Sequence, residues 1–194
     1  VDSVAIPVLE FSEILTDQDL IEIVMTTGED KQNAIARREG ISANVADTLV
    51  EQGNEKTVAT LMHNTTADVR ETTLARALDR FGDSEEISTA VTRRPHVPIN
   101  IAERLVTMVT TSLEALLADK GEGAPDHTAD LVLQVRERAT LGLVDPRFGI
   151  GEVTSLVESL SESNRLTDSI IFRALCMGDI AFFESSLAHL EIGR

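Results

Sequence analysis

Apolar residues recur along most of the chain with the three- and four-residue spacing of helices that bury one face. Leu20 and Val24 show this spacing at the start of the chain. Thr16 precedes them and is followed three residues later by Asp19, which predicts a capping box at a helix start. Sustained alternation of apolar and polar residues, typical of half-buried strands, is absent from the sequence. The pattern therefore predicts an all-α fold.

Capping residues, glycines and prolines set the bounds of the predicted helices. Short helices are expected after Thr16, Ser42, Asn54 and Asp83, the last with a second capping box to Glu86. Further helices are expected at about 67–81, 98–118, 128–143, 150–162, 167–177 and 179–190. The stretch from Val4 to Leu9 is apolar but contains Pro7, so we expect an extended arm there.

The middle of the chain contains an apparent repeat. Gly28, Gly53 and Gly82 each end a predicted helix directly before acidic or capping residues. They are spaced 25 and 29 residues apart, and a short turn and another helix follow each one. Helical proteins contain glycine junctions of this kind without true repeats. The three junctions in register favour an α-solenoid, in which each helix pair buries its apolar face against its neighbours.

The run from Leu15 to Val106 resembles HEAT-like repeats, and the chain as a whole resembles an uncharacterised alphaproteobacterial family, the domain-of-unknown-function family 2336. The matching residues are the segments 15–20, 34–38 with Ile41-Ser42, 58–64, Arg165-Leu166-Thr167, 173–179 and Phe182-Phe183-Glu184. The resemblance implies a helical fold, implies no activity, and implies that family members continue beyond the equivalent of Arg194.

Composition suggests two domains. A HEAT-like repeat domain is expected over 1–118 and a C-terminal helical bundle over 128–194, with a glycine-rich linker at 119–127. Within the bundle, the apolar segment 170–183 contains three of the six phenylalanines, at Phe172, Phe182 and Phe183. We expect this apolar segment to fold back onto the bundle, to form a homo-oligomer contact, or both.

Charge and cysteine usage limit the partners and the compartment. The net charge is −16, which disfavours binding to nucleic acid and to anionic membranes. The single cysteine, Cys176, rules out an internal disulfide and indicates a reducing compartment. The sequence contains no apolar stretch of about 20 residues, the length that crosses a bilayer. A cytoplasmic protein is expected.

Catalytic and metal-binding patterns are missing from the sequence. The four histidines have no metal-ligand spacing, and no nucleophile or phosphate-loop motif occurs. Cys176 lies among apolar residues and is expected to be buried and inert. The sequence therefore predicts a protein without enzymatic activity, cofactor or metal.

Two arginine pairs stand out in this acidic chain. Arg37-Arg38 and Arg93-Arg94 occupy equivalent repeat positions and would lie along one edge of a stack. Arginine forks onto carboxylate or phosphate and anchors interfaces. Arginines near a helix C-terminus also offset the helix dipole, which is the simpler interpretation.

Three functions are compatible with these observations. The first is a module that binds another protein, in bacterial signalling or regulation. The second is a regulator that binds a small anionic ligand, such as a nucleotide, through the arginine pairs. The third is an enzyme completed by a further C-terminal part or by a partner.

Overall fold

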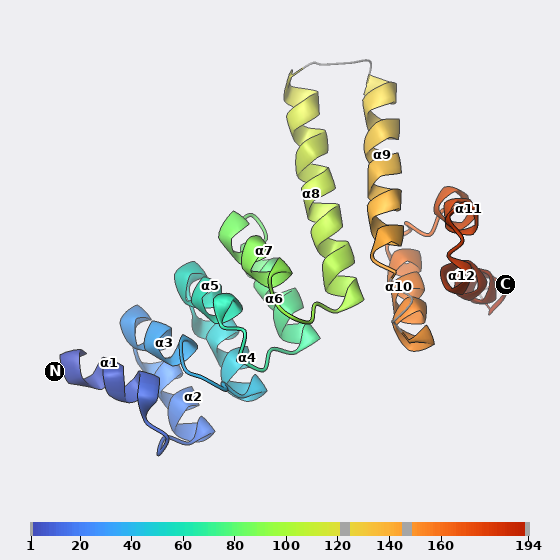
Figure 1. Cartoon of the computed structure of the whole chain (residues 1–194). Helices are drawn as coiled ribbons and strands as arrows, with labels where there is room; N and C mark the ends of the chain where they lie inside the picture. Colours follow the sequence, from blue (N-terminus) through green and yellow to red (C-terminus); the bar gives the residue numbers. More distant parts are fainter. Residues whose placement is uncertain (1, 121–124, 145–148, 193–194) are drawn as a thin grey trace. The chain divides into compact units, whose positions relative to one another are not determined.

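The all-α prediction is confirmed. A computed structural model describes residues 2–120, 125–144 and 149–192, and this part of the chain forms twelve helices without a strand (Figure 1). The chain divides into two compact units, Val1–Val97 and Pro98–Arg194.

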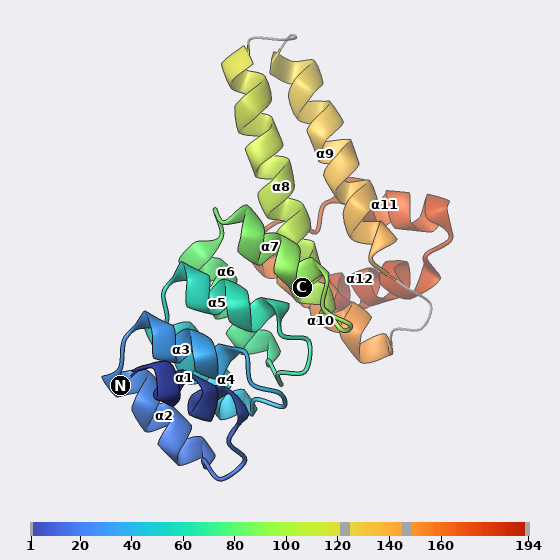
Figure 2. The same ribbon diagram turned by 60° about the vertical axis from the view of Figure 1, so that its left-hand side comes forward.

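The first unit is a two-layer stack of short helices. Helices α1, α3, α5 and α7 pack one on the next to form one layer, and α2, α4 and α6 form the other (Figures 1 and 2). The bounds are α1 Asp2–Phe11, α2 Asp17–Thr26, α3 Glu29–Ala36, α4 Ala43–Gln52, α5 Glu55–His63, α6 Glu71–Phe81 and α7 Glu85–Thr92. This arrangement confirms the prediction of helix pairs stacked in series.

Buried aliphatic side chains between the layers hold the stack together. Fully buried members are Val24, Ile35, Val45, Leu49, Leu61, Met62, Leu74, Leu78 and Ile87. The three repeat glycines lie at the predicted junctions, where α2 meets α3, α4 meets α5 and α6 meets α7. Each unit of the repeat is therefore one helix pair, whose apolar face is covered by its neighbours.

Two local predictions were wrong. The segment containing Pro7 is part of α1, because α1 packs on α3 and buries Leu9, and this packing outweighs the hydrogen bond that proline cannot donate. The cap of α7 is Ser84, whose hydroxyl accepts from the Ile87 amide at 3.4 Å, and not Asp83. The capping box of Thr16 and Asp19 is present as predicted.

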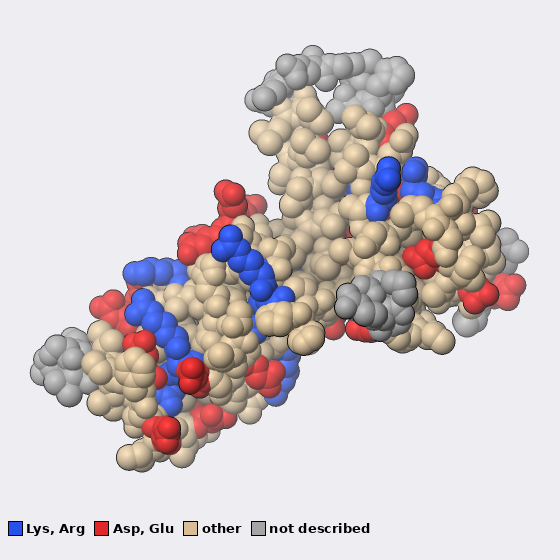
Figure 3. All heavy atoms as spheres, in the orientation of Figure 1, with Lys and Arg blue, Asp and Glu red and all other residues tan. Residues whose placement is uncertain are grey.

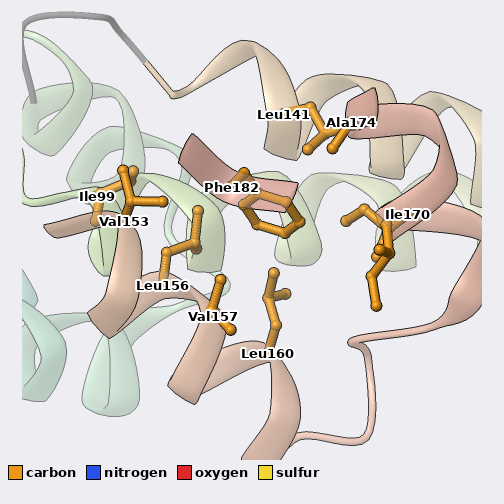
Figure 4. Close-up of a cluster of buried hydrophobic side chains, with 10 residues drawn as sticks. Ile99, Leu141, Val153, Leu156, Val157, Leu160, Ile170, Ala174 and Phe182 are labelled. Carbon is orange, nitrogen blue, oxygen red and sulfur yellow. The ribbon is translucent and has the colours of Figure 1, made fainter. Parts of the chain in front are cut away.

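The second unit contains the long helices α8 and α9 and three shorter ones. The bounds are α8 Ile99–Lys120, α9 Pro125–Gly142, α10 Ile150–Glu162, α11 Asp168–Met177 and α12 Ile180–Ile192. Helix α8 packs on α9 and α10, and α12 packs on α10 and α11. Figure 4 shows the core, where Phe182 is surrounded by aliphatic side chains. The core consists of Ile99, Leu141, Val153, Leu156, Val157, Leu160, Ile170, Ile171, Ala174 and Phe182.

The phenylalanine-rich segment folds back onto the bundle, which was one of its two expected fates. Phe182 is fully buried and Phe183 packs against the core, whereas Phe172 remains exposed. A homo-oligomer contact through this segment stays a prediction.

Along the sequence, the boundary between the two units lies at another position than the boundary between the predicted domains. The predicted first domain, 1–118, includes nearly all of α8, whereas the contacts of α8 place it with α9 and α10 in the second unit. The predicted linker, 119–127, is helical at both described ends, since α8 runs to Lys120 and α9 begins at Pro125. Residues 121–124 lie outside the described residues.

Candidate functional site

The helix ends of the first unit are joined by side chains that come from the next helix pair along the chain. Arg38, two residues after the end of α3, donates to the carbonyl oxygens of Leu9 and Ser12, the latter at 2.7 Å. These carbonyls belong to the C-terminal end of α1, where the last helical carbonyls have no partner within their own helix. Arg38 therefore caps the preceding helix of its layer.

Asn64 does the same for α3. Its side-chain amide donates to the carbonyl oxygens of Ala36 at 3.0 Å and Arg38 at 2.6 Å. Asn64 comes just after the end of α5 and Arg38 just after the end of α3, and each donates to carbonyls at the end of the preceding helix of the layer, so the two residues have equivalent roles one repeat apart.

Arg94 completes the series. Its guanidinium donates to the carbonyl oxygens of Met62 at 3.2 Å, Asn64 at 3.0 Å and Ala67 at 2.7 Å. Burial lowers the pKa of Arg94, and nearby Asp68 acts in the opposite direction. Charge-assisted hydrogen bonds to three carbonyls compensate for this burial. Arg38, Asn64 and Arg94 thus form one ladder that links four consecutive helices of the layer.

The residue before each ladder residue lies on the surface. Arg37, His63 and Arg93 are exposed at the C-terminal ends of α3, α5 and α7. The side chains of Arg37 and Arg93 make no hydrogen bond or ion pair within the described part of the chain, and His63 lies 3.9 Å from a carboxylate oxygen of Glu86. We call these three residues the basic row.

The structure therefore splits each predicted arginine pair. The second arginine of each pair is used inside the stack, and the first belongs to the basic row. Sequence reasoning did not single out His63 and Asn64 as candidate site residues. The sequence contains a signal for them. When Leu61-Met62-His63-Asn64 is aligned with Ile35-Ala36-Arg37-Arg38, His63 corresponds to Arg37 and Asn64 to Arg38.

Helix ends of the other layer are capped in a similar way, by α3 at the end of α2 and by α6 at the end of α4. Gln32 donates from its side-chain amide to the carbonyl of Val24 at 2.8 Å, at the end of α2. Arg80 donates to the carbonyls of Val50 and Glu51 at the end of α4. Side chains of α6 also form ion pairs with α4, namely Arg70 with Asp47 and Arg76 with Glu51, each at 2.8 Å.

An open hollow lies on the outer surface of α5 and α7, next to the basic row. Four carboxylates contribute to its lining, and Arg93 and His63 lie at the same surface. The lining residues are Glu55, His63, Asp83, Ser84, Glu85, Glu86, Thr89 and Arg93. Figure 3 shows the same mixture over the first unit, where basic side chains alternate with acidic ones. A small anion would meet several negative charges here.

Two buried carboxylates organise the second unit. Glu137 on α9 accepts from Ser169 at 2.9 Å and from the Arg173 guanidinium at 3.1 Å, and Thr167 donates to it at 3.3 Å. Glu103 on α8 forms an ion pair with Arg165. Arg165, Thr167 and Arg173 are among the C-terminal residues that carry the family resemblance, and their contacts give them a structural role.

No group of three or more histidine, cysteine or acidic side chains in the part of the chain that the structure describes could hold a metal ion. Cys176 was expected to be buried, and this is wrong: the thiol is exposed. Helix α11 buries Ile170, Ile171 and Ala174, and Cys176 lies on another face. Among the described helices, none combines the length and apolar character that a membrane crossing requires.

The chain belongs to a family described as an uncharacterised protein conserved in bacteria (DUF2336), whose model matches residues 4–192. The narrower alphaproteobacterial restriction stays a prediction, as does the HEAT-like character of the repeats. No curated protein and no solved structure matches the chain.

Proposed function

We propose that this member of the bacterial family is a non-enzymatic module that binds another protein through the outer surface of α3, α5 and α7. The observation that carries the proposal is that, at each of three helix ends, one residue joins the stack and the residue before it is exposed. Arg38, Asn64 and Arg94 are used to join the stack, whereas Arg37, His63 and Arg93 are exposed at three successive repeats. Residues free of packing duties on a stacked scaffold are available for a partner.

The spacing of the basic row favours an extended partner over a small ligand. Neighbouring helices pack about 8–10 Å apart, so Arg37 and Arg93, which lie two helices apart, are separated by roughly 20 Å. The hollow beside Arg93 adds carboxylates to the same surface. A protein segment with both charge signs complements this surface, whereas a nucleotide is repelled by the acidic side chains.

The proposed compartment is the cytoplasm. Cys176 is the single cysteine of the chain, and its thiol is free and exposed. A reducing compartment keeps an exposed thiol from forming disulfides with other molecules.

The test places a photo-crosslinking amino acid at His63 and, as a control, at exposed Glu22 on α2, in the bacterial cytoplasm. We expect a defined protein adduct from position 63 and none from position 22. Arg37→Glu with Arg93→Glu should reduce the adduct about tenfold or more, because two interface charges are reversed. Arg76→Glu makes the same kind of charge change on α6, in the other layer, where Arg76 pairs with Glu51 at 2.8 Å, and should leave the adduct unchanged.

The crosslinking experiment and a thermal melt together separate the alternatives. An adduct insensitive to Arg37→Glu with Arg93→Glu would rule out the basic row as the binding surface. A rise in melting temperature with nucleotides or inorganic phosphate, abolished by the same two substitutions, would instead favour the anionic-ligand hypothesis.

A further inference from the structure

The hairpin of α8 and α9 exposes an apolar stripe that the second unit does not cover. Residues 105–117 of α8 include a single charged residue, Glu114. On α8, Val109 is 67% exposed and Leu116 is 60% exposed, and Leu113 lies between them. On α9, Leu131 is 60% exposed, and Val135 follows one turn later. Figure 3 shows the visible surface of α8 as mostly uncharged.

The spacing of these residues is that of a helix-bundle seam. Val109, Leu113 and Leu116 follow one another at intervals of four and three residues, and Leu131 and Val135 at an interval of four. Intervals of three and four residues place side chains in one row along a helix, as in the heptads of coiled coils and four-helix bundles.

Both rows lie on the same side of the hairpin. In the half nearer the connection, no other helix of the second unit runs alongside (Figure 1), so the buried Thr110 and Val132 face the neighbouring helix of the hairpin. Val109 comes one residue before Thr110, and Leu131 comes one residue before Val132. One residue corresponds to a rotation of about 100° around the helix axis. On both helices, the exposed row therefore points about 100° away from the side that faces the other helix, with the same sense of rotation along the chain. Because the two helices run antiparallel, the same turn brings both rows to one face.

We propose that this face binds the same face of a second copy of the chain, so that two hairpins form a four-helix bundle. A two-fold contact needs a surface that is complementary to itself, and two parallel apolar rows form such a surface. Charge permits a second copy at this place: two chains with a net charge of −16 each repel one another, and the α8 row lies in a stretch, 105–117, with the single charged residue Glu114.

The size of the face fits a weak, reversible dimer. The part of α8 from Val109 to its end at Lys120 is about 18 Å long, and two adjacent helices are about 20 Å wide. This part of the hairpin therefore offers roughly 350 Å² to its partner, less than half the value of about 800 Å² per partner of standard interfaces. We expect a dimer that is populated at concentrations of roughly 100 μM and above.

The test is sedimentation equilibrium of the full chain over a range of concentrations. We expect a rise from the monomer mass of 21.1 kDa towards twice that value. Leu116→Glu and Leu131→Glu should each raise the dimer dissociation constant by about 100-fold or more, because each places a carboxylate in the apolar contact twice. Both side chains are mostly exposed, so the helical circular-dichroism signal should be unchanged.

Two control variants make the result specific to this face. Thr111→Glu adds the same charge at an exposed position on the other side of α8, and Phe172→Glu adds it on the exposed part of α11. Both should leave the dimer intact. A monomer at every concentration would overturn the proposal, and so would a dimer that survives Leu116→Glu and Leu131→Glu. Loss of the dimer in Phe172→Glu alone would place the contact on the phenylalanine-rich segment instead.

Discussion

At the scale of single residues, Gly53 shows how tightly the chain turns between the two helices of one pair, α4 and α5. Its backbone is ordinary, with φ −69° and ψ 154°, so conformation alone does not require glycine. A Cβ atom at this position would lie 2.5 Å from the Leu49 carbonyl oxygen and 3.0 Å from Cγ2 of Thr57. Gly28, at the equivalent junction, has no atom within 4 Å of the same place. The repeat pattern identifies both glycines, and only the packing distinguishes them.

The pair of substitutions Gly53→Ala and Gly28→Ala tests this difference. We expect Gly53→Ala to lower the free energy of unfolding by about 1–3 kcal/mol, because the added methyl group overlaps a backbone oxygen. Gly28→Ala should change it by about 0.5 kcal/mol or less. Urea denaturation followed by circular dichroism measures both. Equal effects of the two substitutions would contradict the close approach at Gly53.

Two aspartates at helix starts have opposite pKa shifts. Burial raises the pKa of Asp179 above its ordinary value of 3.8, and the hydrogen bond from the Phe182 amide opposes this shift. Hydrogen bonds with Thr16 lower the pKa of Asp19. A raised pKa means that the folded state favours the protonated form, so the stability that Asp179 contributes is lost as the pH rises through its folded pKa. The stability that Asp19 contributes is lost in the opposite direction, as the pH falls.

Asparagine substitutions at these positions should therefore differ in sign. Asp179→Asn retains a hydrogen-bond acceptor without the charge, and should raise the melting temperature at pH 7 relative to the wild type. Asp19→Asn should lower it at pH 7. The difference for Asp179→Asn should shrink as the pH falls below 3.8, and the difference for Asp19→Asn should shrink only at a lower pH, below the lowered folded pKa of Asp19. Thermal melts at pH 7, 5 and 3 measure them, and shifts of the same sign at pH 7 would contradict the assignment.

At the scale of helices, the sequence predicted most of the molecule correctly. The helices at 150–162, 167–177 and 179–190 lie within two residues of α10, α11 and α12. These helices have clear start and stop residues. At the start of α11, the Thr167 hydroxyl accepts from the Ile170 amide, and at its end Gly178 adopts the left-handed conformation, with φ 82°, which favours glycine. Local chemistry decides these ends.

The helix-scale errors have a different cause. The residues of α1 contain a proline and give no clear helical signal, and it is packing on α3 that makes them a helix. Cys176 was expected to be buried because it lies among apolar residues. Helix α11 has more apolar residues than its buried face can hold, so Phe172, Leu175 and Met177 are also exposed. Contacts between distant segments decide both cases, and short-range patterns do not contain them.

At the scale of the whole molecule, the candidate site could be predicted only in part. The sequence pointed to Arg37, Arg38, Arg93 and Arg94, and to an edge on which they lie. It could not show which arginine of each pair faces the stack, because that depends on where the preceding helix ends in space. It also did not show that Asn64 takes the place of an arginine in the middle repeat, since an amide and a guanidinium share only the ability to donate to carbonyls.

The central claim is that the second arginine of each pair joins the stack and the first is exposed. One pair of substitutions tests this claim most directly. Arg94→Ala removes hydrogen bonds to the carbonyls of Met62, Asn64 and Ala67, and should lower the free energy of unfolding by about 2–3 kcal/mol. Arg93→Ala removes an exposed side chain of the same kind one residue away, and should change it by about 0.5 kcal/mol or less. Urea denaturation of the two variants under identical conditions is the measurement. A large loss for Arg94→Ala with little change for Arg93→Ala supports the account, and equal losses, or the reverse order, would contradict it.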